Sequence, residues 1–131
     1  MKVKVVSIPV MDQAKALAFY TDKMGFVKKH DMPLGGGNRW LTVVNKEEQE
    51  GVEVLLEPAP LHFEPAKVYQ DALKAAGIPC TGFYVDSVDD EYERLINLDV
   101  SFSVKPTVMG TSKIAVLDDT CGNFIQLVEI L

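Results

Sequence analysis

Several features that mark specialised classes of protein are scarce in this chain. Its two cysteines, Cys80 and Cys121, are too few for a disulfide framework and lack CxxC spacing. Basic residues are outnumbered, and the net charge of -6 disfavours binding to nucleic acid or to an anionic membrane. No apolar stretch approaches the roughly 20 residues that cross a bilayer. We therefore expect a cytoplasmic protein with neither nucleic acid nor membrane as its partner.

The remaining composition is that of an ordinary globular protein, with 47% hydrophobic and 24% charged residues. A chain of 131 residues can close one hydrophobic core, so we expect a single domain over residues 1–131. The opening residues alternate between polar and apolar, which predicts a strand over roughly residues 2–10 and not a signal peptide. A helix should follow, with Asp12 as its N-cap and Gly25 as its C-terminal stop.

The order of expected elements repeats once along the chain. A strand, a helix and three further strands fill a first βαβββ module, residues 1–58, and the same order fills a second, residues 80–131. Between them, the proline-punctuated linker 59–79 carries one short helix. A sheet with a helix on one face has a bare face to bury. The sequence therefore predicts an α+β fold, in which two βαβββ modules form a concave, partly closed mixed β-sheet cleft with the helices outside.

Two segments carry motifs of a known family. The stretch from Val10 to Phe26 resembles V-x-D…F-Y-x-x-x-L-G-F, and the stretch from Asp118 to Leu127 resembles D-P-x-G-x-x-x-E-L. The chain thus resembles the vicinal oxygen chelate superfamily, which includes glyoxalase I, bleomycin-resistance proteins and extradiol dioxygenases. The resemblance covers essentially the whole chain. It implies a small-molecule cleft between the modules and a homodimer.

The same resemblance implies where metal-dependent relatives hold a divalent cation. Carried over residue by residue, the former metal positions are Val5, Leu55, Cys80 and Gln126. Valine and leucine cannot act as ligands, cysteine is a soft ligand, and the neutral carbonyl of glutamine is a poor anchor beside it. We therefore expect no metal and no other cofactor, with a divalent metal disfavoured.

The fourth strand predicts acidic groups in the cleft. Val54 and Leu56 share one face of this strand, while Glu53, Leu55 and Glu57 share the other. If the apolar face meets the helix, the glutamates point toward the cleft, where Glu53 is a general base or a polar anchor. The alternative places both glutamates at a solvated rim.

Three further residues are candidates for ligand binding, each with a structural alternative. Gln126 can donate and accept hydrogen bonds to a ligand, or it can bond to neighbouring side chains in the core. Trp40 and Tyr84 offer aromatic surface to a planar ligand, or they belong to the core or a dimer interface. Gly82, on the same face as Tyr84, leaves room for a ligand.

Other polar residues are interpreted as structural. Nothing in the sequence places His30 or His62 beside a nucleophile, so we expect both on the surface. Asp118 and Asp119 fall in a turn, where aspartates that stabilise the turn are far more common than cation ligands.

The leading hypothesis is a metal-independent protein that binds a small organic molecule in the cleft, like the bleomycin-resistance branch. The alternative is a lyase, isomerase or dioxygenase with a shifted metal set of Glu53, Glu57 and Gln126. A third possibility is a protein whose main role is assembly with a partner. Whether the chain is an enzyme, and which residues would be catalytic, is left open by the sequence.

Overall fold

The computed structural model describes all residues from Met1 to Leu131. The first half of the chain forms a four-stranded mixed sheet with the order β1-β4-β3-β2, in which β1 and β4 are parallel and the other pairs are antiparallel. Its elements are β1 (Val5–Val10), α1 (Gln13–Ala18), β2 (Val27–Gly35), β3 (Asn38–Val44) and β4 (Glu53–Pro58).

The first helix has the expected ends but not the expected form. Asp12 caps it, because its carboxylate accepts a hydrogen bond of 2.9 Å from the Lys15 amide. After Ala18 the chain continues as a π-helical turn, Phe19–Lys23, and Gly25 then adopts a φ of 85°. That left-handed conformation suits glycine, and it ends the helix where the sequence predicts.

The second half repeats the first, with the strand order β5-β8-β7-β6 and the same single parallel pair. Its elements are β5 (Thr81–Tyr84), α4 (Val88–Ile96), β6 (Phe102–Met109), β7 (Ser112–Asp118) and β8 (Phe124–Ile130). Ser87 caps α4 through the Asp90 amide. Between the modules lie α2 (Ala59–His62) and α3 (Glu64–Ala75). The α+β fold with two βαβββ modules is confirmed.

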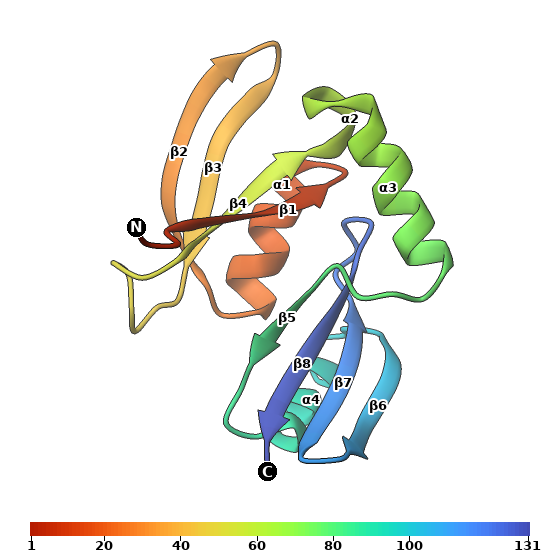
Figure 1. Ribbon diagram of the computed structural model, residues 1–131. Coiled ribbons are helices and arrows are strands. Elements are labelled where there is room, and N and C mark those ends of the chain that lie inside the picture. The colour runs from red at the N-terminus through yellow and green to blue at the C-terminus, as the bar shows by residue number, and fades with distance from the viewer.

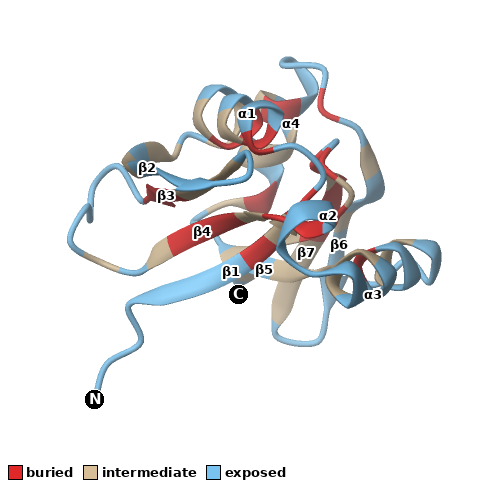
Figure 2. Cartoon of the chain, turned by 90° about the horizontal axis from the view of Figure 1, so that it is seen from above, coloured by how far each residue is buried: buried red, intermediate tan, exposed pale blue.

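One contiguous core lies on the helix side of both sheets. It contains Ile8, Val10 and Leu56 of the first sheet with Ala16 of α1, and Ala115 and Leu127 of the second sheet with Leu95 of α4. The sheets lie side by side and are open, not closed into one barrel (Figure 1). From above, α1 and α4 lie together on one side (Figure 2). The opposite face of each sheet, which we call its open face, is left without a covering helix of its own module.

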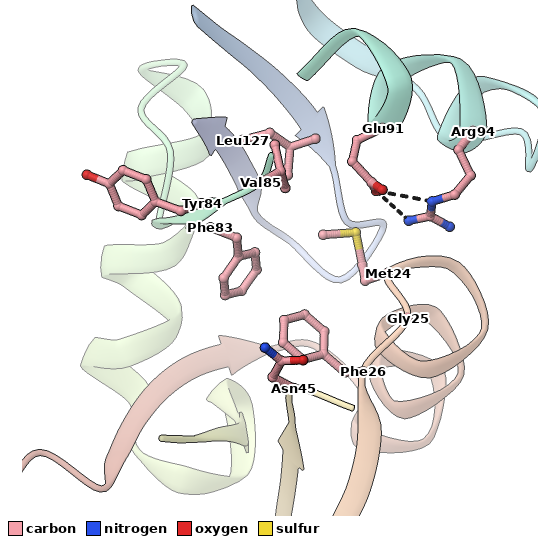
Figure 3. Close-up of a pocket in the computed structure, with 10 residues that line it drawn as sticks. All are labelled: Met24, Gly25, Phe26, Asn45, Phe83, Tyr84, Val85, Glu91, Arg94 and Leu127. Carbon is pink, nitrogen blue, oxygen red and sulfur yellow. Dashed lines mark hydrogen bonds and ion pairs between the residues drawn. The ribbon is translucent and has the colours of Figure 1, made fainter. Parts of the chain in front are cut away.

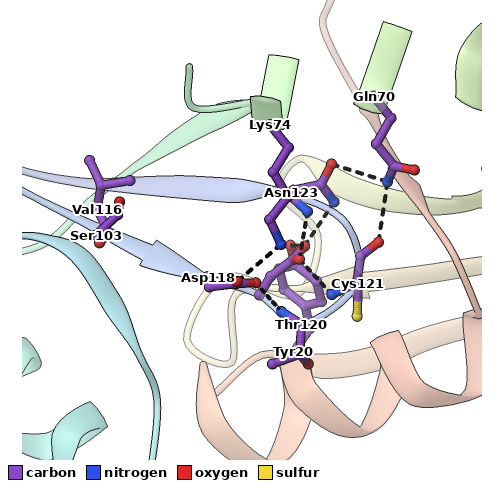
Figure 4. Close-up of polar contacts among 10 residues, drawn as sticks. Tyr20, Gln70, Lys74, Ser103, Val116, Asp118, Thr120, Cys121 and Asn123 are labelled. Carbon is purple, nitrogen blue, oxygen red and sulfur yellow. Dashed lines mark hydrogen bonds and ion pairs between the residues drawn. The ribbon is translucent and has the colours of Figure 1, made fainter. Parts of the chain in front are cut away.

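A buried polar network joins the two modules. Asp119 accepts hydrogen bonds from the Tyr20 hydroxyl at 2.7 Å, the Cys121 amide at 2.7 Å, and the Asn123 amide and side chain at 3.0 and 2.8 Å. Gln70, on α3, donates to the Pro9 carbonyl at 2.8 Å. It also donates to the Asn123 side chain at 3.2 Å (Figure 4). The expectation of a turn-forming Asp119 is confirmed, because its Oδ1 accepts hydrogen bonds from the Cys121 and Asn123 amides of the same turn.

The turn beside this network requires glycine. Gly122 has a φ of 102°, and a Cβ there would lie 2.7 Å from the Gln70 side-chain nitrogen. Both the backbone conformation and the close approach therefore exclude a larger residue. The turn brings the Asp119 network against the linker helix, which ties α3 to both modules.

None of the helices is both long enough and apolar enough to pass through a lipid bilayer.

Candidate ligand-binding site

The open face of the first sheet gathers three of the predicted ligand-binding residues. Val54 and Leu56 belong to the core, so Glu53 and Leu55 point to the opposite side of β4. Trp40 shares this open face, because its neighbours Leu41 and Val43 are buried against the core. The prediction that the β4 glutamates turn away from the helix is confirmed.

Glu53 is held by the Thr42 hydroxyl of the neighbouring strand β3 and by His30 of β2, one strand further away. Its Oε1 accepts a hydrogen bond of 2.7 Å from the Thr42 hydroxyl and lies 2.9 Å from Nδ1 of His30. These contacts, the Thr42 hydrogen bond foremost, lower the pKa of Glu53 below its ordinary value although partial burial opposes them. With 12% of its side chain exposed, Glu53 is an ionised carboxylate set into the sheet surface, and not a solvated residue at a rim.

Glu57, four residues further along β4, has similar contacts. Its Oε1 accepts a hydrogen bond of 2.8 Å from the Ser7 hydroxyl, and its Oε2 lies 3.0 Å from Nε2 of His62. His30 and His62 are therefore partly exposed, as expected, but each contacts a carboxylate of β4. Sequence reasoning missed both pairs.

Trp40, Leu55 and Glu57 also line a pocket of about 140 Å³ between the β2–β3 hairpin, β4 and α2. His62 closes one side of it. Aromatic, aliphatic and acidic surfaces thus meet in one small hollow on the open face of the first sheet.

The remaining predicted ligand-binding residues lie on the open face of the second sheet. Gln126 pairs with Gly82 across β5 and β8, while its neighbours Ile125 and Leu127 are buried in the core. The Gln126 side chain is half-buried and makes no hydrogen bond within the chain. Tyr84 lies on the same face with 74% of its surface exposed. The structure does not bring these residues together with Trp40, Glu53 and Leu55 within one chain.

The former metal positions are divided in the same way. Val5 and Leu55 lie on the first sheet and Gln126 on the second, while Cys80 packs against the core. The resemblance implies that Cys80 faces the cleft with the other former metal positions, but Cys80 lies in the bend before β5, which begins at Thr81. Burial raises the pKa of the Cys80 thiol, which disfavours the thiolate that a metal requires.

The shifted metal set does not converge either. Four residues along a strand span about 13 Å, so Glu53 and Glu57 cannot both reach one ion at ligand distance. No group of three or more His, Cys, Asp or Glu side chains is arranged to hold a metal ion.

A larger hollow of about 460 Å³ lies where the modules meet (Figure 3). Met24, Phe26 and Phe83 give it apolar walls, and of the predicted site residues only Tyr84 reaches it. The guanidinium of Arg94, which also lines the hollow, donates hydrogen bonds to Glu91 and to a backbone carbonyl. The two charged side chains in the lining of this hollow are thus engaged with each other.

Known proteins resemble this chain over its whole length. The profile of the Glyoxalase/Bleomycin resistance protein/Dioxygenase superfamily matches residues 2–127. The uncharacterized protein YurT of Bacillus subtilis (strain 168) is 49% identical over 129 residues, 98% of this chain and 99% of that protein. The crystal structure of UcmS2 has a TM-score of 0.82 with 35% identity, covering 98% of both chains. That of TnmS3, an antibiotic binding protein from Streptomyces sp. CB03234, has a TM-score of 0.73 with 25% identity, covering 100% of this chain and 97% of that one.

Proposed function

The chain belongs to the glyoxalase/bleomycin resistance protein/dioxygenase superfamily, and from that premise we propose that it binds a small organic molecule without a metal ion. One observation carries the proposal. The open face of the first sheet carries Trp40 and, in the small pocket beside it, the largely buried Leu55. Its two carboxylates, Glu53 and Glu57, are each paired to a histidine, and no group of three charged ligands converges on one ion. An apolar surface with a few fixed polar groups is typical of small-molecule sites.

The similar structures support a binding role. TnmS3 is described as an antibiotic binding protein, and the fold similarity extends over the whole of this chain. We propose that this chain likewise sequesters a drug or metabolite with a planar or hydrophobic body. Trp40 would stack on the ligand, Leu55 would contact it, and Glu53 would accept a hydrogen bond from it.

We further propose that the partner is a second copy of the chain. Both open faces carry exposed apolar residues, among them Met32, Tyr84, Met109 and Ile130. Contiguous exposed apolar surface favours association, and a two-fold dimer would cover both faces at once. The cleft would then combine Trp40, Glu53 and Leu55 of one chain with the partner's Tyr84 and Gln126. Both cysteines are free, as suits a reducing compartment, so the cytoplasm is the location that we propose.

Calorimetric titration with 1,4-dihydroxyanthraquinone tests the proposal. We expect saturable binding to protein stripped with EDTA, with unchanged affinity after Zn²⁺ or Mn²⁺ is added back. Elemental analysis of protein purified without chelators gives the control. A stoichiometric divalent ion, with binding lost on its removal, would favour the metal-dependent enzyme instead.

A further inference from the structure

The pocket between the β2–β3 hairpin, β4 and α2 has the size of one aromatic ring. Its volume is about 140 Å³. An apolar cavity of about 150 Å³ in another protein accommodates benzene, so a single six-membered ring fills a space of this size. Trp40 supplies an aromatic wall and Leu55 an apolar one. The dimensions and lining therefore suit a ring and exclude a fused ring system as a whole.

The polar side of this pocket is an acceptor. Glu57 lies in its lining with 22% of its side chain exposed. A carboxylate offers about four lone-pair positions, and Ser7 and His62 engage only two of them. Glu57 is thus fixed in place by its neighbours while it keeps capacity for a further donor.

The guanidinium of Arg39, near Glu57, does not neutralise the negative charge of this carboxylate. Arg39 also lines the pocket, but its guanidinium makes two hydrogen bonds to Asp31, at 2.9 and 2.7 Å. That bidentate pair keeps the Arg39 charge engaged beside the hairpin. Of the carboxylate and the guanidinium in the lining, Glu57 is therefore the one with unused hydrogen-bonding capacity.

The path of the chain after β4 explains why His62 lies beside Glu57. β4 ends at Pro58, and α2 begins at once with Ala59 and Pro60, which turns the chain back over the strand end. His62, at the end of this short helix, consequently lies against Glu57, five residues earlier in the chain. The side of the pocket that His62 closes is therefore built by the linker and not by either sheet.

From this geometry we propose that the pocket is a subsite for one aromatic ring that carries a hydrogen-bond donor, a hydroxyl or an amine, received by Glu57. The proposal rests on the proposed function, since it specifies which end group of the bound molecule is recognised. The chemical class is thus a phenol- or aniline-like terminus on a larger apolar body.

Paired titrations with phenol and anisole test the subsite, because the two probes share a ring and differ in the donor. Both are followed by the fluorescence of Trp40, the single tryptophan of the chain. We expect phenol to bind about 10-fold more tightly than anisole, the ratio that a hydrogen bond to a charged acceptor provides. Glu57→Gln should reduce that ratio to about 2-fold, while Glu47→Gln, in the exposed loop after β3, should leave it unchanged.

The outcomes separate the subsite from the function. Equal affinities of phenol and anisole on the wild-type chain, or an unchanged ratio in a folded Glu57→Gln variant, overturn the subsite. If 1,4-dihydroxyanthraquinone still binds saturably in that case, the proposed function stands without it. If none of the three probes binds, both proposals fall. The wild-type comparison alone decides the matter should the variant not fold.

Discussion

Two carboxylates in this molecule each accept a hydrogen bond from a hydroxyl group but lie in opposite settings. Asp119, at the junction of the modules, has 0% exposure and receives four hydrogen bonds from Tyr20, Cys121 and Asn123. Glu57, on the open face of the first sheet, receives one hydroxyl and one histidine and remains partly exposed. A saturated, buried carboxylate holds the structure together, whereas a partly exposed one with unused lone pairs can meet a ligand.

The comparison shows that residue type alone does not identify a site. Asp118 and Asp119 form the most conspicuous acidic pair in the sequence, yet Asp119 is fully engaged within the chain, and Asp118 binds Lys74. The glutamates of β4 are less conspicuous in the sequence, yet their partly exposed side chains lie on the open face of the first sheet.

The largest expected effect is on stability at the junction. Asp119→Ala should lower the free energy of unfolding by about 3–5 kcal/mol, because four buried donors lose their acceptor together. Urea denaturation measures the loss. Asp118→Ala is the matched control, and its cost should be about 1 kcal/mol, since that side chain is partly exposed. If the two substitutions lowered the free energy of unfolding equally, the distinction between the buried Asp119 and the partly exposed Asp118 would be wrong.

A subunit-mixing experiment sharpens the comparison between the two open faces. Trp40→Ala and Gln126→Ala chains should each bind 1,4-dihydroxyanthraquinone poorly. Unfolded together and refolded, they should recover binding at about one quarter of the sites, because half of the dimers carry one undamaged composite cleft. Calorimetric stoichiometry reports this recovery. Its absence, with a dimeric mass confirmed by light scattering, would show that each cleft belongs to one chain.

The open-face carboxylates should show the reverse of the Asp119 pattern. Glu57→Gln should change the free energy of unfolding by less than about 1 kcal/mol, since its contacts are partly exposed to water, yet weaken the binding of phenol about 5-fold. Urea denaturation and calorimetry on the same preparation measure both quantities. A variant that unfolds as readily as Asp119→Ala would place Glu57 among the structural acids.

The smallest expected effect is the pH dependence that Glu53 confers. Its pKa is lowered in the folded chain, so its contribution to stability is complete above the pKa of about 4.3 for an ordinary glutamate. The contribution should be lost as the pH falls through the lower pKa of the folded state. The stability difference between wild type and Glu53→Gln should therefore shrink on acidification. Thermal unfolding between pH 7 and pH 3 tests the sign, and a difference that grows in acid would contradict it.

Much of the fold followed from local patterns. Alternation placed Glu53 and Leu55 opposite Val54 and Leu56, and the repeated order of elements predicted the two modules. These features depend on neighbours along one strand or on capping residues, which a sequence displays directly.

The polar contacts could not be predicted in the same way. His30 reaches Glu53 across β3, after an irregularity in the register between Lys28 and His30 that alternation does not reveal. The Tyr20 hydroxyl and Asp119 are 99 residues apart in the chain. Contacts of this kind depend on how the modules pack. The same holds for Cys80, which packs against the core from the bend before β5, where strand alternation does not extend.

Fluorescence of Trp40 during titration with 1,4-dihydroxyanthraquinone, in the presence of EDTA, tests the central claim most directly. The only tryptophan lies on the open face of the first sheet, so its signal reports on that face alone. The account predicts saturable quenching at one ligand per chain, the same with and without the chelator. Quenching that never saturates, or that requires a divalent ion, would contradict it.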